Sequence, residues 1–292
     1  MRRIIIVYNP KASQAERVAR EVLRKKIPGF VVGKVKISGK GFDENVENLA
    51  ELIVDEDLVV AVGGDGTASV VVNAVMRCMA RNVVVAALPY GNFNDMARKY
   101  GTRSIEEVVE KYSCGEIIFS RPLEVFINGG HFRYAECYCS VGMMAEATKV
   151  FDEPEVRERI AKKKGIFRWL SSIFTLAGWY FRNKKRRFVA EKRYSDYLFT
   201  NGGKVAAVMK SGEEQNEKFL SYQGELNKFF RLMGFMIKSI LHKIPGEYSR
   251  GEIIKFGEPR EVAVQVEGEC VKLGEVKEIA VRKAGKRIRV VG

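Results

Sequence analysis

The chain has 292 residues, of which 46% are hydrophobic and 29% charged, a composition that is typical of a folded globular protein and excludes an intrinsically disordered one. This length favours two domains over a single hydrophobic core. Lysine and arginine outnumber the acids and give a net charge of +14, so we expect anionic partners such as nucleotides, acidic phospholipids or nucleic acid.

The first residues and the cysteines indicate a reduced, cytoplasmic chain. The opening segment MRRIIIVYNP has an apolar run that is too short for a secretory signal, so we interpret it as a first buried strand. The chain has five cysteines, an odd number that cannot all pair in disulfides, and they show no zinc-ligand spacing, so the simplest interpretation is that they are reduced.

The first third of the chain alternates strands with helices. The apolar segments without polar alternation predict four strands, over 3–8, 31–37, 58–62 and 83–88. Such strands separated by helices predict a Rossmann-like parallel sheet that is covered on both faces.

Capping residues mark the helices between these strands. Ser13 with Glu16, and Ser104 with Glu107, form the S-x-x-E pattern of a capping box, and Asp43 is expected to cap another helix. The helix after the third strand is expected to continue to about Ala80.

After about Phe119 the pattern changes to that of an antiparallel β-sandwich with inserted helices. The segments 123–127 and 131–139 flank Asn128-Gly129-Gly130, which predicts a hairpin. Short strands are expected around Phe188, Leu198 and Val205 and again from Glu252 onward, and a long helical pattern covers about 216–244.

The segment from Gly165 to Arg187 is unusually aromatic and ends in a basic run, Lys184 to Arg187, with Lys162 to Lys164 just before it. It is too short to span a membrane. We interpret it as a helix that lies either in the core of the second domain or partly at an anionic lipid surface.

Three polar loops follow strands of the predicted parallel sheet: Asn9-Pro10-Lys11, Gly63 to Thr67, and Leu88 to Asp95. Ligands bind at the carboxyl edge of such sheets, and amides at a helix N-terminus hold phosphate. Asp65 would repel a bare anion, so its presence indicates an intervening Mg²⁺ or a proton-accepting role.

The loop GGDGT at Gly63–Thr67, followed by LPYGNFNDMAR at Leu88–Arg98, resembles the catalytic domain of diacylglycerol and sphingosine lipid kinases. That family is similar to the wider NAD kinase and phosphofructokinase group. Three later segments, YCSVGMMAEATKV, KKKGIFRWL and VEGECVKL, also resemble parts of the family, so the resemblance covers nearly the whole chain.

The resemblance implies a two-domain lipid kinase. Residues 1–121 would form the nucleotide-binding α/β domain, to which the last strand, about 284–292, returns, and residues 122–283 would form the β-sandwich that receives the lipid. ATP and Mg²⁺ would lie in the cleft between the domains, and a hydroxyl of a lipid such as diacylglycerol would attack the γ-phosphate.

The resemblance also assigns roles to individual positions. Glu269 would accept the proton, while Asp65 would hold Mg²⁺ or share in catalysis. The residues expected to bind ATP lie in the polar loops: Asn9, Ser38, Gly63, Gly64, Gly66, Thr67, Asn92, Asn94 and Asp95.

Several positions depart from the family pattern. Ser69 and Val70 replace an asparagine and a glutamate, and Asn92 and Phe93 replace a threonine and a glycine. Glu267 replaces an aspartate, and Gln223 replaces an aspartate that helps to hold a structural metal in many relatives.

These departures keep three functions open: an active lipid kinase, a nucleotide- or lipid-binding protein of the same fold without turnover, and a kinase of a soluble substrate such as NAD. We expect peripheral contact with the inner membrane face and no transmembrane segment. No motif indicates a nucleic-acid partner. A homodimer is left open by the sequence.

Overall fold

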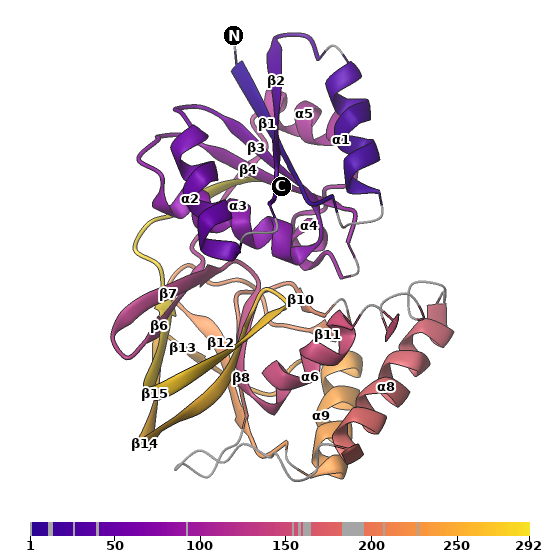
Figure 1. Ribbon diagram of the computed structural model, residues 1–292, viewed down its shortest axis with the longest axis vertical. Coiled ribbons are helices and arrows are strands. Elements are labelled where there is room, and N and C mark those ends of the chain that lie inside the picture. Colours follow the sequence, from indigo (N-terminus) through magenta and orange to yellow (C-terminus); the bar gives the residue numbers. More distant parts are fainter. Residues whose placement is uncertain are drawn as a thin grey trace.

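The structure is a computed structural model that describes residues 2–10, 14–25, 27–38, 41–91, 93–153, 155–156, 159, 165–182, 196–206, 208–226 and 228–292. It has an α/β region and a β region that lie one above the other in Figure 1, with the first residues and the last strand both in the α/β region.

A six-stranded sheet with the order β2-β1-β3-β4-β16-β5 forms the centre of the α/β region. Its strands are β1 (Arg2–Tyr8), β2 (Phe30–Lys36), β3 (Leu58–Gly63), β4 (Val84–Pro89), β5 (Ile117–Ser120) and β16 (Ile288–Val291). The first four are parallel, and β16 lies parallel to β4 and antiparallel to β5.

Helices cover both faces of this sheet: α1 (Ala15–Arg24), α2 (Phe42–Leu52), α3 (Asp65–Arg77), α4 (Asp95–Tyr100) and α5 (Ile105–Cys114). Alternate residues of β1 face opposite cores, since Ile4 and Ile6 pack with α1 and α5 while Ile5 and Val7 pack with α2 and α3. The parallel α/β fold predicted from the apolar segments is therefore confirmed.

The helix ends agree with the predicted caps only in part. Ser104 caps α5, because its hydroxyl accepts a hydrogen bond from Glu107 N at 3.2 Å. The Asp43 prediction is wrong: α2 begins at Phe42 after Gly41, whose φ of 131° suits glycine, so Asp43 lies in the first turn. Ser13 lies outside the described residues.

The C-terminal end of α3 also differs from the prediction. The helix ends at Arg77 rather than near Ala80, because Cys78 adopts an extended conformation.

The β region is built on one antiparallel sheet with the order β13-β12-β9-β8-β14-β15-β6-β7. Its strands are β6 (Leu123–Ile127), β7 (Gly130–Ala135), β8 (Tyr138–Gly142), β9 (Asp196–Thr200), β12 (Phe219–Gly224), β13 (Glu247–Ser249), β14 (Gly251–Val266) and β15 (Glu269–Lys283). Side chains from distant strands, such as Leu123 and Phe219, share one core. The predicted antiparallel β region is confirmed.

The β region also carries the helices α6 (Met143–Asp152), α8 (Gly165–Arg182) and α9 (Phe229–Leu241), and a two-stranded ribbon of β10 (Lys204–Val205) and β11 (Met209–Lys210). Among the described residues, no helix combines the length and apolar character that a membrane crossing requires.

Two predicted elements of the β region are corrected. The strand expected over 131–139 is interrupted, because Glu136 and Cys137 leave the sheet between β7 and β8. The helix expected over 216–244 begins only at Phe229, because β12 pairs with β9 and β13. The strand expected around Phe188 lies outside the described residues.

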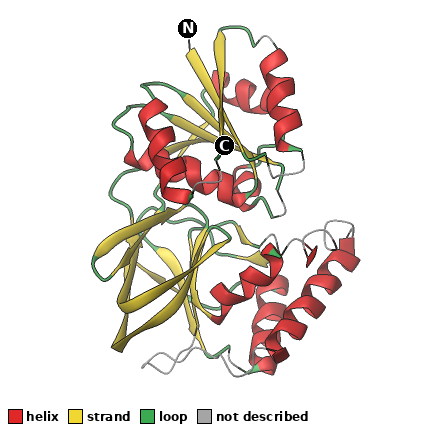
Figure 2. Cartoon of the chain, in the orientation of Figure 1, coloured by secondary structure: helices red, strands yellow, loops and turns green. Residues whose placement is uncertain are grey.

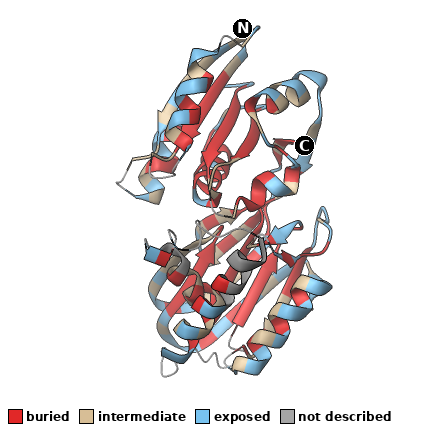
Figure 3. Ribbon diagram, turned by 90° about the vertical axis from the view of Figure 1, so that its right-hand side faces the viewer, coloured by how far each residue is buried: buried red, intermediate tan, exposed pale blue. Residues whose placement is uncertain are grey.

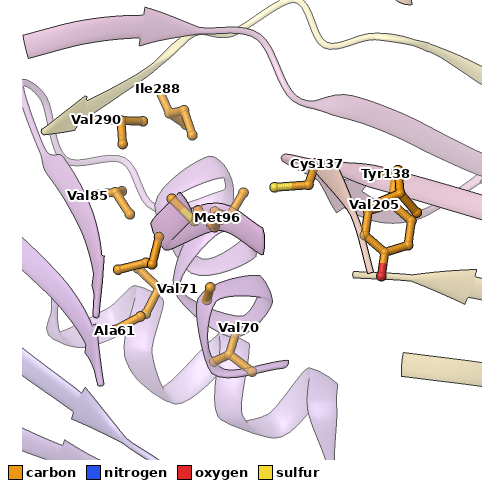
Figure 4. Close-up of a cluster of buried hydrophobic side chains, with 14 of the residues drawn as sticks. Ala61, Val70, Val71, Val85, Met96, Cys137, Tyr138, Val205, Ile288 and Val290 are labelled. Carbon is orange, nitrogen blue, oxygen red and sulfur yellow. The ribbon is translucent and has the colours of Figure 1, made fainter. Parts of the chain in front are cut away.

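The hydrophobic core continues from one region into the other. Figure 3 shows buried residues along the sheets of both regions. Figure 4 shows Val70 and Met96 from the α/β region in the same cluster as Cys137, Tyr138 and Val205 from the β region. The two regions therefore pack directly against each other beside the ends of β3 and β4.

Candidate active site

The loops that follow β1 to β4 lie at one edge of the α/β sheet. Tyr8, the last residue of β1, is aligned with Lys36, the last residue of β2, and Gly63 is aligned with Pro89 at the ends of β3 and β4. The predicted residues Asn9, Ser38 and Gly63 therefore meet at the carboxyl edge of the sheet, where ligands bind in open α/β folds.

The glycine loop after β3 forms the first turn of α3. The amides of Thr67 and Ala68 donate to Gly64 O at 3.0 and 3.1 Å. A side chain on Gly63 would overlap Thr67 Oγ1, so glycine is needed there for Thr67 to pack inward. A Cβ on Gly66 would meet no protein atom within 4 Å, so the opposite side of the turn is open.

The second loop, between β4 and α4, contacts the first through its backbone. A Cβ on Gly91 would overlap Gly64 Cα and lie 2.7 Å from Gly64 N. Asn94, which has a left-handed φ of 56°, accepts from Gly91 N at 2.7 Å and donates to Gly91 O at 2.8 Å. Only a residue without a side chain at position 91 allows this contact between the loops.

Asp65 joins these loops through its side chain. Its Oδ1 accepts from Asp95 N at 2.6 Å, at the first residue of α4. Burial raises the pKa of Asp65, while hydrogen bonds from the amides of Asp95, Met96 and Asn94 oppose that rise. A carboxylate at a helix N-terminus is stabilised by these amides, so Asp65 has a structural contact in addition to any role toward a ligand.

The turn between β14 and β15 reaches this position from the β region. Glu267 and Gly268 have positive φ values of 51° and 82°, which make the tight hairpin turn. A Cβ on Gly268 would lie 4.0 Å from Asp65 Cβ. The hairpin therefore brings Glu269, at the start of β15, to the same edge as the glycine loop.

Glu267 is the buried carboxyl of this turn. It is 3% exposed, and its Oε1 accepts from the amides of Cys137 and Tyr138. Burial raises the pKa of Glu267 to about 8; the Cys137 amide opposes the rise and the charges of Asp65, Glu136 and Asp95 add to it. Glu267 therefore holds a proton at neutral pH in the folded protein.

Glu269 differs from Glu267 because its side chain is 43% exposed. Its Oε2 accepts from Arg133 Nη1 at 2.8 Å. The Arg133 guanidinium in turn lies 3.7 Å from the ring centroid of Phe42, at the start of α2. Arg133 therefore fixes one carboxylate oxygen of Glu269 while the residue stays accessible.

Two asparagines outside the recognised sequence motifs organise the surroundings of the site. Asn45 accepts from Ser38 N at 2.7 Å and donates to Ser38 O at 3.2 Å, which fixes the loop after β2. Asn73, on α3, accepts from Tyr134 N at 2.9 Å and donates to Tyr134 O at 3.0 Å, which ties α3 to β7. Only the tertiary contacts reveal them.

A buried cluster of charges lies at the junction of the two regions. Lys99 donates to Glu136 Oε1 at 2.7 Å and contacts Glu214 Oε2 at 2.7 Å, and its side chain is 6% exposed. Burial opposes the charge on Lys99, but Glu136 and other neighbours outweigh it and hold the pKa of Lys99 well above its ordinary value. The cluster connects the end of α4 to the β region.

The acidic side chains at the sheet edge could bind a cation that also contacts a bound nucleotide. Asp65, Asp95 and Glu267 interact electrostatically, and oxygen donors are what Mg²⁺ prefers. No three His, Cys, Asp or Glu side chains in the described part of the chain are arranged to hold a metal. Mg²⁺ often binds one or two carboxylates and completes its shell with phosphates, so this donor set fits Mg²⁺ bound together with a nucleotide.

The departures from the family pattern have visible consequences. Ser69 and Val70 are 2% and 4% exposed, and Val70 packs in the core where a glutamate is common in the family. Gln223 donates to Glu252 Oε2 at 3.3 Å. Asn92 and the basic runs 162–164 and 184–187 lie outside the described residues.

Comparison with known protein families identifies the segment that carries this site. Residues 3–119 match the family model described as "Diacylglycerol kinase catalytic domain". This segment contains both loops and α4, so the resemblance predicted from the sequence is confirmed here.

A solved structure shares the fold over nearly the whole chain. The crystal structure of a diacylglycerol kinase from Bacillus anthracis str. Sterne superposes with a TM-score of 0.65 and covers 99% of this chain and 96% of that one, at 16% sequence identity. At this identity the likeness establishes the fold, including the β region.

Curated relatives match a shorter part. The chain is 26% identical to an NAD kinase of Chloroflexus aggregans and 27% identical to one of Chloroflexus aurantiacus, in each case over 97 residues. The matches cover 33% of this chain and 32% of each relative, so the chain spans about a third of the length of these relatives.

Proposed function

We propose, from the match of residues 3–119 to the diacylglycerol kinase catalytic domain, that the protein is an ATP-dependent kinase that transfers the γ-phosphate of ATP to a hydroxyl of a membrane lipid such as diacylglycerol. The observation that carries this proposal is the contact between the two loops, in which Gly91 lies against Gly64 and Asp65 accepts from Asp95 N.

The proposal divides the chain by task. Residues 1–121, together with the returning segment 284–292, bind the nucleotide, and residues 122–283 receive the acceptor. ATP then lies between the carboxyl edge of the α/β sheet and the hairpin turn at Glu267–Glu269.

The N-terminus of α3 is the proposed phosphate site. Its amides point along the helix toward the sheet edge, and the helix dipole favours an anion there. Gly66 leaves open space beside this turn. Around it, the proposed nucleotide contacts are Asn9, Ser38, Gly63, Gly64, Thr67, Asn92, Asn94 and Asp95.

Asp65 is the proposed protein ligand of Mg²⁺, which when bound would neutralise charge on the phosphates. Asp65 Oδ1 accepts from Asp95 N, and the amides of Met96 and Asn94 also stabilise the carboxylate, so the proposed metal contact would add to these hydrogen bonds.

Glu269 is the proposed acceptor of the hydroxyl proton. It is more accessible than Glu267, and the Arg133 contact holds its carboxylate in one orientation beside the glycine loop. Glu267, protonated near neutral pH, is unsuited to accept another proton. Phosphoryl transfer depends mainly on positioning and charge stabilisation, which this arrangement of fixed loops supplies.

Incubation with Mg²⁺ and γ-labelled ATP in the presence of diacylglycerol micelles tests the proposal. We expect a labelled phospholipid product, and an at least roughly 100-fold lower rate for Glu269→Gln. Glu261→Gln, on an exposed part of β14, is the matched control and should keep the wild-type rate. Bound ATP without any labelled lipid would contradict the lipid-kinase proposal and favour the binding-protein or the soluble-substrate alternative.

Asp65 needs two variants because it has two contacts. Asp65→Asn keeps an oxygen that can accept from Asp95 N, whereas Asp65→Ala removes it. We expect both to lose activity, but only Asp65→Ala to lose about 1–2 kcal/mol of stability in urea unfolding. Equal activity of Asp65→Asn and wild type would exclude the proposed metal role.

The NAD kinase relatives favour a second acceptor class, a soluble nucleotide. The same labelled assay with NAD in place of the lipid distinguishes the two. Label in NADP and none in lipid would replace the lipid acceptor with a soluble one and leave the phosphate site unchanged.

A further inference from the structure

The helices α8 and α9 lie next to each other in the β region, on the side opposite β14 and β15 (Figure 1). Both helices expose large apolar side chains. We call this surface the aromatic face. It consists of Phe174, Phe181, Phe230, Ile237 and Leu241, which are 72%, 57%, 87%, 46% and 64% exposed.

Helical spacing places these residues in two stripes. Phe174 and Phe181 are about two helical turns apart on α8, and on α9 Ile237 follows Phe230 by about two turns and Leu241 follows Ile237 by about one turn. The stripes meet at the end of α8, where the ring centroids of Phe181 and Phe229 are 4.9 Å apart and those of Phe229 and Phe230 are 5.8 Å apart.

The inner sides of the two helices bury several hydroxyl groups, while their outer sides expose phenylalanines. Ser171 and Thr175 on α8, and Ser239 on α9, are buried at 7%, 8% and 0% exposure. A surface helix of a globular protein normally buries its apolar residues and exposes its polar ones. Both helices do bury apolar residues against the core, among them Leu176 on α8 and Phe235 on α9. The exposed phenylalanines therefore form a second apolar side, and an exposed apolar patch of this kind marks an interaction surface.

The charged residues of α8 and α9 have a single sign. The sequences of α8 and α9 contain no aspartate or glutamate. The basic residues at their exposed positions are Arg182, Lys228, Arg231 and Lys238, of which Arg231 pairs with Glu225. Exposed aromatic side chains flanked by lysine and arginine are the chemistry of a helix that lies in the interface of an anionic membrane.

We propose that α8 and α9 form the surface by which the protein docks on an anionic lipid membrane, with the aromatic face entering the headgroup region and the flanking basic residues contacting lipid phosphates. The proposal rests on the proposed function for the need to reach a lipid acceptor. A second copy of the chain fits less well, since a symmetric contact would bring the same positive charges together.

Vesicle flotation without ATP tests the docking surface separately from catalysis. Wild-type protein should float with vesicles that contain acidic phospholipid and bind much less to vesicles of phosphatidylcholine alone. Changing Phe174, Phe181 and Phe230 together to serine should lower the partition coefficient about tenfold or more. These side chains are exposed, so near-wild-type thermal unfolding should confirm that the variant is folded.

Matched controls use similar residues elsewhere on the surface. Met79→Ser combined with Phe119→Ser removes side chains that are 95% and 56% exposed on the α/β region and should leave binding unchanged. Lys228→Glu with Lys238→Glu should weaken binding to acidic vesicles about tenfold, and Lys277→Glu with Arg287→Glu should change it less than about twofold.

Equal flotation of the triple serine variant and wild type would overturn the proposal. A second result would also overturn the proposal: wild-type protein that binds no vesicles and is a dimer in analytical ultracentrifugation, while the triple serine variant is a monomer. The aromatic face would then be a protein interface. The two proposals can also give different outcomes. If wild-type protein binds vesicles, the triple variant does not, and neither phosphorylates a lipid, the docking surface is upheld and the lipid-kinase proposal is rejected.

Discussion

The junction between the two regions and the outer surface of α8 and α9 depart from ordinary burial in opposite directions. The junction buries charge: the side chains of Lys99, Glu136 and Lys283 are 6%, 1% and 4% exposed. The outer helices expose Phe174 and Phe230 at 72% and 87%. Charged residues are rarely buried unless paired, and large aromatic residues are rarely this exposed.

The comparison separates two physical tasks. At the junction each buried charge has a partner, so the cluster fixes α4, and through it the loop with Asn94 and Asp95, against the β region. On α8 and α9 the exposed side chains make ring contacts mainly with one another, and their chemistry suits a partner outside the chain. Stability should therefore depend strongly on the junction and weakly on the aromatic face.

The largest effect is expected at the junction. Glu136→Gln removes a charge that Lys99 contacts at 2.7 Å and that Ser120 and Tyr100 contact as well. Because the buried Lys99 would then depend on Glu214, which also pairs with Lys283, we expect a loss of about 3 kcal/mol in urea unfolding. Glu217→Gln, in an exposed pair with Arg250, is the control and should cost less than about 1 kcal/mol. Equal losses would show that the buried cluster has no special structural role.

The contact between the two loops should be the next most sensitive point. Gly91→Ala places a methyl group against the backbone of Gly64, so we expect a loss of about 1–3 kcal/mol and weaker ATP binding. Gly66→Ala has free space and lies in a helix, so its stability should stay equal or rise by up to about 1 kcal/mol. If phosphate uses that space, ATP affinity in calorimetry should nevertheless fall; unchanged affinity would place the phosphate elsewhere.

The Glu267 carboxyl should give a pH dependence of stability. Its folded pKa of about 8 exceeds the ordinary glutamate pKa of 4.5, so the folded state binds more protons than the unfolded state between these pH values. Stability contributed by this group is therefore complete below about pH 4.5 and falls by up to roughly 1.4 kcal/mol per pH unit as pH rises toward 8. Glu267→Gln should remove this slope from denaturant unfolding measured between pH 5 and 8. An unchanged slope would mean that Glu267 is ionised throughout.

The smallest effect is expected at the aromatic face. Phe230→Ser changes a side chain that is 87% exposed, so the free energy of unfolding should change by less than about 0.5 kcal/mol. Phe235→Ser, one helical turn away but 6% exposed, should cost about 3 kcal/mol or more. A large loss from Phe230→Ser would show that the residue stabilises the fold instead of awaiting a partner.

Much of the α/β region follows from the sequence alone. The strands β1, β3 and β4 consist mainly of buried apolar residues between helices, so neighbouring residues suffice to identify them. The edge strand β2 is only partly buried, yet its apolar residues also predicted it. The two loops carry glycine and asparagine where the backbone needs them, at Gly63, Gly91 and Asn94, and their positions after consecutive strands predict a shared edge.

The β region depended on pairing partners that are far apart in the chain. Phe219–Gly224 lies within the segment predicted as one long helix, yet it forms β12 because β9 and β13 supply hydrogen bonds on both sides. The strand predicted across Glu136 ends early because that side chain turns toward Lys99, a residue from the other region. Such competition is decided by contacts that no local window contains.

At the site, the sequence by itself determined the residue types and the tertiary structure decided their surroundings. The resemblance indicated carboxylates at Asp65, Glu267 and Glu269, but only the fold buried Glu267, placed Arg133 against Glu269, and set Asp65 on the amides of α4. Burial and long-range partners control the protonation and orientation of a carboxyl group, and both arise only when distant segments pack together.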